Sequence, residues 1–494
     1  MSLVIVTMFA PVLATGSSAT TASETAVAND SLPTCSTDLD LLERKIHQNY
    51  AGYALELRGE RLTRFASMKA AAQTRARNAR GDDCFSVLRD FVEWFADPHL
   101  FVYQSTRLDT AETARRAQSV ARRTVSEADA RAYFGRRAEK LDPIEGIWYD
   151  RGLRVAILPD SSRAGAFVAV VLTPDTSVWQ AGAIRAQLTR RAEGGYDVDL
   201  LARNYAVSHL RARVYRHVLL RLSPGLWGKA FPVAAADSGT LDPVDPHRPT
   251  LVMYGATPVF SIPSHDPAYK RVIDSLVLAN RDLLSHADRM IVDVRGNEGG
   301  SSFTTEYLVP FLTTKEDKPD PFPGNRSVML SSDEQVAYAR QGFGPDTSAF
   351  VRTLLARLRA APGELVPLND PSAPPSPPDP REWVVTSGPR AVGVLTDGGT
   401  VSAGEVLVLN ALRSHRATVF GAPTAGALDY QSVNIVRLSP REPRWLIGYP
   451  TITRSADLPA GGMRGRGIPP QVPLDLDRLR DPVRAVDAYL ARRK

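Results

Sequence analysis

A serine stands at a strand-to-helix junction in the segment TDGGTVSAGEVLVL, which runs from Thr396 to Leu409. The apolar residues before this segment predict a strand, Gly398 and Gly399 predict a tight turn, and the residues after Ser402 predict a helix. The first backbone amides of a helix lack intrahelical acceptors, so they can stabilise negative charge that develops beside the serine. Ser402 is therefore a candidate nucleophile.

The same residues also fit a purely structural role. Ser402 and Glu405 have the spacing of a capping box, in which the hydroxyl bonds a helix amide and the carboxylate reaches back. The local sequence alone favours this cap. The position of Ser402 just beyond the end of a strand shifts the interpretation toward a nucleophile, and both roles stay open at this stage.

A second glycine-rich loop follows another predicted strand in RMIVDVRGNEGGSS, from Arg289 to Ser302. Glycines let backbone amides approach a bound group, so this loop can complete an oxyanion hole or hold a peptide. The alternative is an ordinary tight turn between a strand and a helix. The loop lacks the lysine and serine of a nucleotide-binding P-loop.

Length and composition exclude several classes of protein. The 494 residues exceed what one hydrophobic core usually organises, and 43% apolar with 23% charged residues is typical of a soluble protein. The 60 basic residues outnumber the 54 acidic ones but form no block, so no nucleic-acid partner is expected. The histidines are dispersed and no CxxC motif occurs, so neither a metal site nor a cofactor is expected.

The amino terminus predicts export. An apolar run from Leu3 to Ala14 and a polar stretch after it resemble a secretory signal, although the usual basic residues are absent. A periplasmic or extracellular location is therefore expected, with no integral membrane segment, because no stretch is long and apolar enough. Cys35 and Cys84 are either two buried thiols or a disulfide, and export favours the disulfide.

Periodicity divides the chain into units. Helical spacing in the first part gives way to period-two alternation from Ile144 to Leu222, which predicts antiparallel strands of a small barrel or sandwich. Downstream, strands alternate with helices as in an α/β layer, with LVMYGATPVFSIPS as one strand, SSFTTEYLVPFL as one helix, and SVNIVRL and RWLIGYPTITR as further strands. The predicted units are a leader (1–30), an N-terminal helical unit (35–135), a β-rich insert (140–230), an α/β core (245–480) with a proline-rich linker near 369–381, and a C-terminal helix (481–494).

Four segments together resemble the C-terminal processing (tail-specific) and tricorn-type serine peptidase family. They are MIVDVRGNEGG, VGVLTDGGTVSAGE, ATVFGAPTAG and GRGIPPQVPL, in that order, over roughly residues 250–475. The resemblance implies an α/β (α+β) fold with a crotonase-related core, which binds an extended peptide along a sheet edge. It also implies Ser402 as nucleophile, with Ala403 and either Gly299 or Gly300 supplying the oxyanion amides.

The resemblance also bears on the general base. In the processing-peptidase branch a lysine follows the Thr-x-Gly of the loop after the nucleophile, and Ala427 stands there in this chain. In the tricorn-like branch, the general base is a histidine in a segment that precedes the core, and the segment FVEWFADPHLFVY has His99 at that position. Imidazole can accept the serine proton and return it to the leaving amine. His99 is therefore the expected base and His265 the second choice.

Two departures concern the acid that would orient the histidine. The tricorn-like site implies a serine before the histidine and a glutamate in a late glycine loop, where this chain has Pro98 and Arg464. Asp97, Asp457 and Asp429 are candidate substitutes. The peptide-binding PDZ module is also replaced by the β-rich insert.

Two functions follow from these patterns. The first is a serine endopeptidase that cleaves a peptide or protein substrate through an acyl-enzyme. The alternative is a family member without catalysis that binds a peptide or a small apolar ligand, as carriers with a resembling fold do. The inward aromatics of the insert fit such a ligand, but they fit an ordinary core better.

Overall fold

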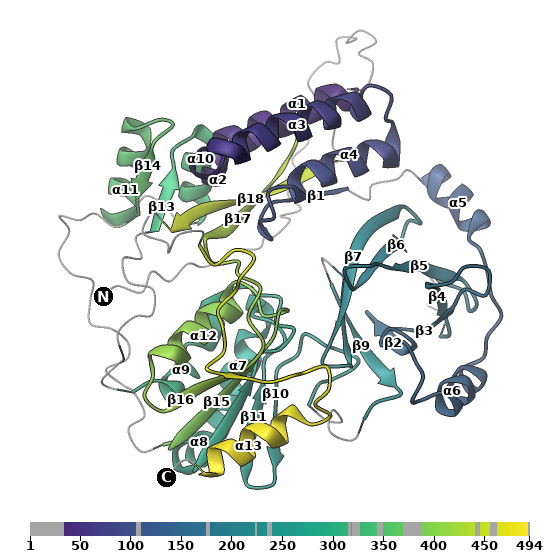
Figure 1. The fold of residues 1–494 in the computed structure, drawn as a ribbon, viewed down its shortest axis with the longest axis vertical. Helices are drawn as coiled ribbons and strands as arrows, with labels where there is room; N and C mark the ends of the chain where they lie inside the picture. Colours follow the sequence, from purple (N-terminus) through teal and green to yellow (C-terminus); the bar gives the residue numbers. More distant parts are fainter. Residues whose placement is uncertain are drawn as a thin grey trace, which may run out of the picture.

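The computed structural model places the chain in three packed bodies, which Figure 1 shows as a helical body, a barrel and an α/β sheet. The described residues are 34–104, 110–173, 178–222, 225–234, 240–314, 318, 327–342, 349–368, 388–439, 445–454 and 462–492. The predicted leader and the proline-rich linker lie outside these residues.

Amphipathic helices begin the first body, drawn in purple in Figure 1. They are α1 (Cys35–Asn49), α2 (Ala51–Glu56), α3 (Gly59–Ala76) and α4 (Gly81–Glu93). Leu42 and Ile46 lie four residues apart on one face of α1, and both are fully buried, as is Leu88 of α4. A disulfide joins Cys35 to Cys84, as the sequence predicts, with 5.5 Å between their Cα atoms.

A five-stranded sheet completes this body. Its strands are β1 (Phe101–Gln104), β13 (Ser327–Leu330), β14 (Leu365–Pro367), β17 (Tyr430–Arg437) and β18 (Trp445–Arg454), with α10 (Asp333–Gly342) and α11 (Ala349–Ala360) beside them. The assignment of β17 and β18 to the α/β layer is wrong, because β18 pairs with β1 and β13. Trp445, Ile447 and Tyr449 bury one face of β18 in the core of the N-terminal helices.

The β-rich insert is a closed antiparallel barrel, in which the last strand pairs with the first. Its strands are β2 (Gly146–Asp150), β3 (Leu153–Pro159), β4 (Ala166–Val171), β5 (Ile184–Arg190), β6 (Tyr196–Leu201), β7 (Val207–Tyr215), β8 (Leu219–Leu222) and β9 (Leu226–Phe231). Trp148, Trp179 and Trp227 belong to its buried core, which is the plain structural role for these aromatics.

Two helices precede the barrel, α5 (Thr110–Ser119) and α6 (Glu127–Arg136). The sequence placed this stretch with the N-terminal helices. Phe134 of α6 instead packs with Ile147 and Ala156 of the barrel wall. Helical periodicity predicts an apolar face but does not identify the surface that covers it, which explains the difference.

The third body is a six-stranded sheet in the order β10 (Thr250–Tyr254), β11 (Thr257–Ser261), β12 (Arg289–Asp293), β15 (Ala391–Thr396), β16 (Ala417–Gly421) and β19 (Val472–Pro473). All neighbours from β11 onward are parallel. The predicted single strand at 251–264 is instead the hairpin β10–β11, because Gly255 turns the chain with φ +57°.

Helices cover both faces of this sheet. They are η1 (Pro267–Tyr269), α7 (Lys270–Ala279), α8 (Arg281–His286), η2 (Ser302–Thr305), α9 (Val309–Leu312), α12 (Ala403–Arg413) and α13 (Pro482–Arg492). The single helix expected over 301–312 is divided into η2 and α9. Pro310 lies in the first turn of α9, where its missing N–H costs no hydrogen bond.

The parallel strands fix where chemistry can gather. Strands β11, β12, β15 and β16 end at one edge of the sheet, so the loops that follow them meet there. Leu407 and Val408 of α12 pack on one face and Val486 and Leu490 of α13 on the other. Covered on both faces, the sheet is a rigid platform for the loops at its edge.

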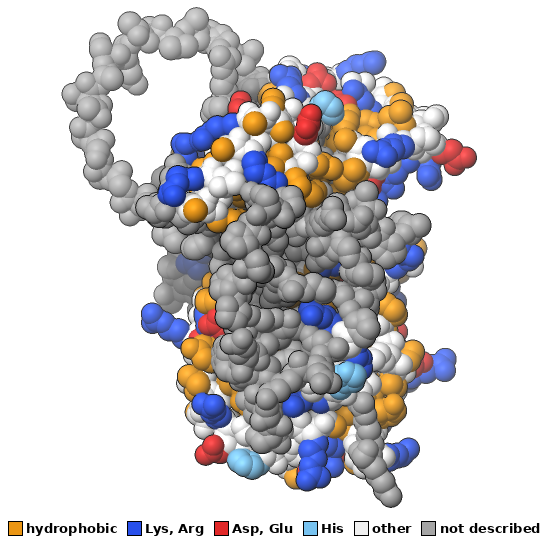
Figure 2. All heavy atoms as spheres, turned by 90° about the vertical axis from the view of Figure 1, so that its left-hand side faces the viewer, with side chains coloured by type: hydrophobic (Ala, Val, Ile, Leu, Met, Phe, Trp, Pro, Cys, Tyr) orange, Lys and Arg blue, Asp and Glu red, His pale blue; other side chains and the backbone are white. Residues whose placement is uncertain are grey.

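The surface carries mixed side chains. On the face in Figure 2, basic side chains lie scattered among acidic and apolar ones over the described part of the molecule. Among the helices of the described ranges, none has both the length and the apolar character needed to cross a membrane.

Candidate active site

Ser402 lies in the loop after β15, immediately before α12. The backbone of Ser402 has φ 54° and ψ −112°, and only 6% of the residue is exposed. For a residue with a side chain this conformation is strained, by about 1–3 kcal/mol, and such strain concentrates at functional sites. A serine held on a sharp turn between a strand and a helix is also the arrangement of hydrolase nucleophiles.

Ser126 shows what an ordinary serine cap looks like in this chain. It precedes α6 with φ −82° and ψ 156°, and its side chain accepts a hydrogen bond from the Asp129 amide. Extended backbone of this kind is normal at a helix N-cap. Ser402 does form the capping-box arrangement with Glu405, but its backbone is far from extended. Capping therefore does not explain the conformation of Ser402.

Glu405 is the centre of the loops around Ser402. Its carboxylate accepts hydrogen bonds from the amides of Ser402 at 2.9 Å, Gly426 at 2.7 Å and Ala427 at 2.9 Å, and from the Thr424 hydroxyl at 2.6 Å. The residue is fully buried, and burial raises the pKa of its carboxyl group. Glu405 thus ties the start of α12 to the loop after β16.

The glycine loop after β12 lies directly against the nucleophile. Gly299 has φ +84°, and a methyl group there would stand 2.9 Å from the Cβ of Ser402, so only glycine fits. The Gly299 amide, however, donates to Oδ1 of Asn297 at 2.8 Å, so this amide is not free for an oxyanion. The candidate donors are then Gly300 and Ala403, the latter at the first position of α12, where amides lack intrahelical acceptors.

The structure brings His99 from the first body to the same region. His99 precedes β1, and its Nδ1 lies 2.6 Å from the carbonyl oxygen of Tyr430. A carbonyl only accepts, so Nδ1 carries the proton and Nε2 keeps the lone pair that a base needs. Burial lowers the pKa of His99, while the Tyr430 carbonyl, the charge of Glu405 and the backbone of Ala427 raise it. The imidazole therefore lies beside the loops that hold Ser402.

Two of the three predicted acid partners lie within the described residues, and neither of these two is hydrogen-bonded to the His99 ring. Asp97 accepts from the backbone amide of His99 at 2.8 Å, rather than from its imidazole. Asp429 accepts from the amides of Met463 and Arg464. Asp457 lies outside the described residues.

Sequence reasoning missed the acid whose charge does act on His99, which is Glu405. The signal was present in the capping-box spacing, but that spacing carries no information about a distant histidine. Arg464, where the resemblance implies a glutamate, pairs instead with Glu56 of α2. This ion pair ties the late glycine loop to the body that carries His99.

His265, the second-choice base, has a structural role. Its backbone amide donates to the Gly299 carbonyl and its own carbonyl accepts from the Ser301 amide, both at 2.8 Å. Its Nδ1 lies 3.1 Å from Oδ1 of Asn297. Burial lowers the pKa of His265 to about 4, which makes it a weak base at neutral pH. His265 supports the glycine loop beside Ser402.

A family comparison now gives these residues a context. Residues 261–473 match the model of peptidase family S41, a span that includes Ser402 and the glycine loop but not His99. This part of the chain belongs to peptidase family S41. The match supports a serine-type peptidase, and peptides or proteins are the class of substrate that the family implies.

Solved structures resemble this chain only distantly. Mature CPAF matches with 13% identity and a TM-score of 0.44, over 93% of this chain and 95% of that one. The photosystem II D1 C-terminal processing protease has 15% identity and a TM-score of 0.35, over 93% and 98%. The tricorn protease has 13% identity and a TM-score of 0.39, over 93% of this chain but 36% of its own. No curated relative matches the chain.

Proposed function

We propose that this protein is a serine endopeptidase in which Ser402 attacks the peptide carbonyl and His99 acts as general base. The Ser402 proton passes to Nε2 of His99 as the Oγ–C bond forms. The carbon–nitrogen bond then breaks, His99 protonates the leaving amine, and water hydrolyses the acyl-enzyme. Ala403 and Gly300 are the proposed oxyanion donors.

The observation that carries this proposal is the strained backbone of Ser402. An ordinary cap needs no strain, as Ser126 demonstrates within the same chain. The strain is balanced by surrounding contacts, of which the Glu405 bond to the Ser402 amide is the most direct. Ala427 stands where the other branch carries its lysine, and burial lowers the pKa of His265 to about 4, so His99 is the proposed base.

A fluorophosphonate probe tests the nucleophile. We expect labelling of the wild type and none of Ser402→Ala, whereas Ser126→Ala, the matched cap variant, should label at the wild-type rate. His99→Gln should slow labelling by roughly 100-fold, since a general base contributes about 10²–10⁴. Equal labelling of wild type and Ser402→Ala would refute the assignment, and no labelling at all would favour the carrier alternative.

We also propose that the protein is exported. The Cys35–Cys84 disulfide supports this location, because disulfides persist mainly in oxidising compartments. Cell fractionation with detection of the full chain tests the proposal. Recovery of the protein with reduced thiols in the cytosolic fraction would overturn it.

A further inference from the structure

A pocket of about 440 Å³ lies between the end of α4 and the barrel strands β6, β7 and β8. Arginine dominates its lining, together with two tyrosines and one glutamate: Arg191, Arg211, Arg213, Arg221, Tyr196, Tyr215 and Glu93. None of these residues has a part in the reaction proposed above. The pocket is therefore a separate feature that the peptidase mechanism leaves unexplained.

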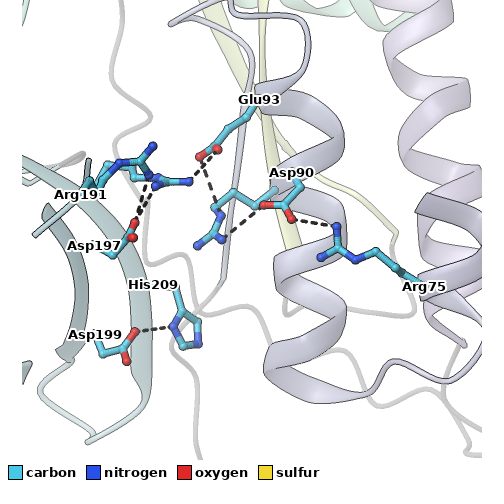
Figure 3. A network of polar contacts seen from close by, with 9 residues as sticks. Arg75, Asp90, Glu93, Arg191, Asp197, Asp199 and His209 are labelled. Atoms are coloured by element: carbon cyan, nitrogen blue, oxygen red, sulfur yellow. Dashed lines mark hydrogen bonds and ion pairs between the residues drawn. The ribbon is translucent and has the colours of Figure 1, made fainter. Parts of the chain in front are cut away.

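Two of the four arginines are balanced by carboxylates. Figure 3 shows Glu93 of α4 facing the barrel, with Arg191 and Asp197 on the opposite side. Asp197 pairs with Arg211 at 2.6 Å and with Arg191 at 3.2 Å, and Glu93 pairs with Arg211 at 3.3 Å. The Glu93–Arg211 pair fastens the barrel to the helix that leads to His99, and the two Asp197 pairs lie within the barrel.

The other two arginines are not balanced. Arg213 and Arg221 are direct partners across the antiparallel pair β7–β8. Like charges opposite each other in a sheet are destabilising. Throughout the described part of the chain, no carboxylate pairs with either guanidinium, so the pocket has an excess of positive charge. An anionic ligand would remove this repulsion.

The pocket also adjoins the nucleophile turn. Nη1 of Arg221 donates to the carbonyl of Gly399 at 2.8 Å. A methyl group on Gly399 would stand 2.6 Å from Cε1 of Tyr215, which shows how closely the two surfaces pack. Gly399 is in the turn that precedes Ser402. Because an extended peptide advances about 3.3 Å per residue, the pocket is within reach of a side chain near the scissile bond.

We infer that this arginine-lined pocket binds an acidic side chain of the peptide substrate, close to the bond that Ser402 attacks. The inference rests on the proposed peptidase function and adds a substrate preference to it. Guanidinium groups bind carboxylates through paired, charge-assisted hydrogen bonds, which suits aspartate and glutamate. The exposed Arg213 presents such donors at the pocket. Arg221 adds positive charge beside it, because its Nη1 already donates to Gly399 and its Nη2 lies 3.4 Å from the Tyr215 hydroxyl.

Peptide binding to the full chain carrying Ser402→Ala tests the inference without interference from turnover. Three fluorescein-labelled decapeptides of glycine and alanine are compared by anisotropy: one with three glutamates and an amidated end, one with three glutamines and an amidated end, and one with three glutamines and a free carboxylate. The glutamate peptide should bind about tenfold more tightly than its amidated glutamine match, and added salt should reduce the difference.

Arg213→Glu in the same background should abolish the preference for glutamate. Arg136→Glu, an equal charge change at an exposed arginine of α6 outside the pocket lining, should preserve it. Equal binding of both amidated peptides, or equal losses in the two variants, would overturn the inference. Preferential binding of the free-carboxylate peptide would also overturn it, in favour of a chain-end site. Phosphonate labelling is measured in a separate experiment. Absence of labelling would therefore overturn the proposed peptidase function, whereas equal binding of the amidated peptides would overturn the proposed preference for acidic side chains.

Discussion

Replacement of Glu405 by glutamine tests whether this side chain holds the site together. One carboxylate oxygen accepts from Thr424 and Gly426, and the other accepts from Ser402 and Ala427. A glutamine must place an NH₂ group at one of these positions. At the second position two backbone amides lose their acceptor, whereas at the first only Gly426 does, because the threonine hydroxyl can turn to accept.

The glutamine orientation that leaves only the Gly426 amide without an acceptor sets the expected loss of stability. One buried amide without an acceptor costs about 1–3 kcal/mol, so Glu405→Gln should lower the free energy of unfolding by that amount. Phosphonate labelling should also slow, since the Ser402 amide and the loop beside His99 share this carboxylate. Removal of the negative charge should lower the pKa of His99 further and move the acid limb of labelling to lower pH.

Urea unfolding followed by fluorescence measures the stability, with Glu364→Gln as the control. Glu364 is exposed, so its substitution should change the free energy of unfolding by less than about 0.5 kcal/mol. A loss for Glu405→Gln that is no larger than this control would refute the role assigned to Glu405. An unchanged labelling rate together with reduced stability would confine that role to folding.

Three further perturbations follow from the structure. Burial raises the pKa of Asp97 from 3.8 to about 7, so between these pH values the folded state binds more protons than the unfolded state, and stability falls by about 1.4 kcal/mol per pH unit as pH rises. In urea unfolding, Asp97→Asn should flatten this slope and be more stable than the wild type at pH 8. An unchanged slope would contradict this. Gly399→Ala should lower the free energy of unfolding by about 1–3 kcal/mol through overpacking, and it should slow phosphonate labelling. The control Gly135→Ala, where nothing lies within 4 Å of the added methyl group, should raise the free energy of unfolding by about 0.5–1 kcal/mol. Similar thermal shifts in the two variants would argue against close packing at Gly399. Cys35→Ser and Cys84→Ser should each lower the free energy of unfolding by about 4 kcal/mol, because the disulfide closes a separation of 49 residues. Wild-type stability of Cys84→Ser in denaturant would contradict this.

Local patterns in the sequence were sufficient for several features. Alternation from Ile144 to Leu222 predicted the antiparallel insert, and the glycines before Ser402 predicted a tight turn at a strand end. These features depend on residues that are neighbours in the chain. The period of the apolar residues and the backbone freedom of glycine act over a few positions, so the sequence carries them directly.

The backbone strain of Ser402 and the role of Glu405 were decided only by the tertiary structure. A capping box and a nucleophile turn share the same residue types, and they differ in a dihedral angle that no spacing encodes. Likewise, the carboxylate of Glu405 acts on His99 only because β1 pairs with β18 in a sheet outside the α/β layer.

Chain separation gives the physical reason for this division. His99 and Tyr430 are 331 positions apart, yet they share a hydrogen bond of 2.6 Å. Apolar periodicity predicts that Trp445 and its alternate neighbours face a core, but it does not identify which of the several cores in the described residues covers them. Only the packing of the N-terminal helices on β18 selects among these cores, and that packing places the imidazole beside the serine loops.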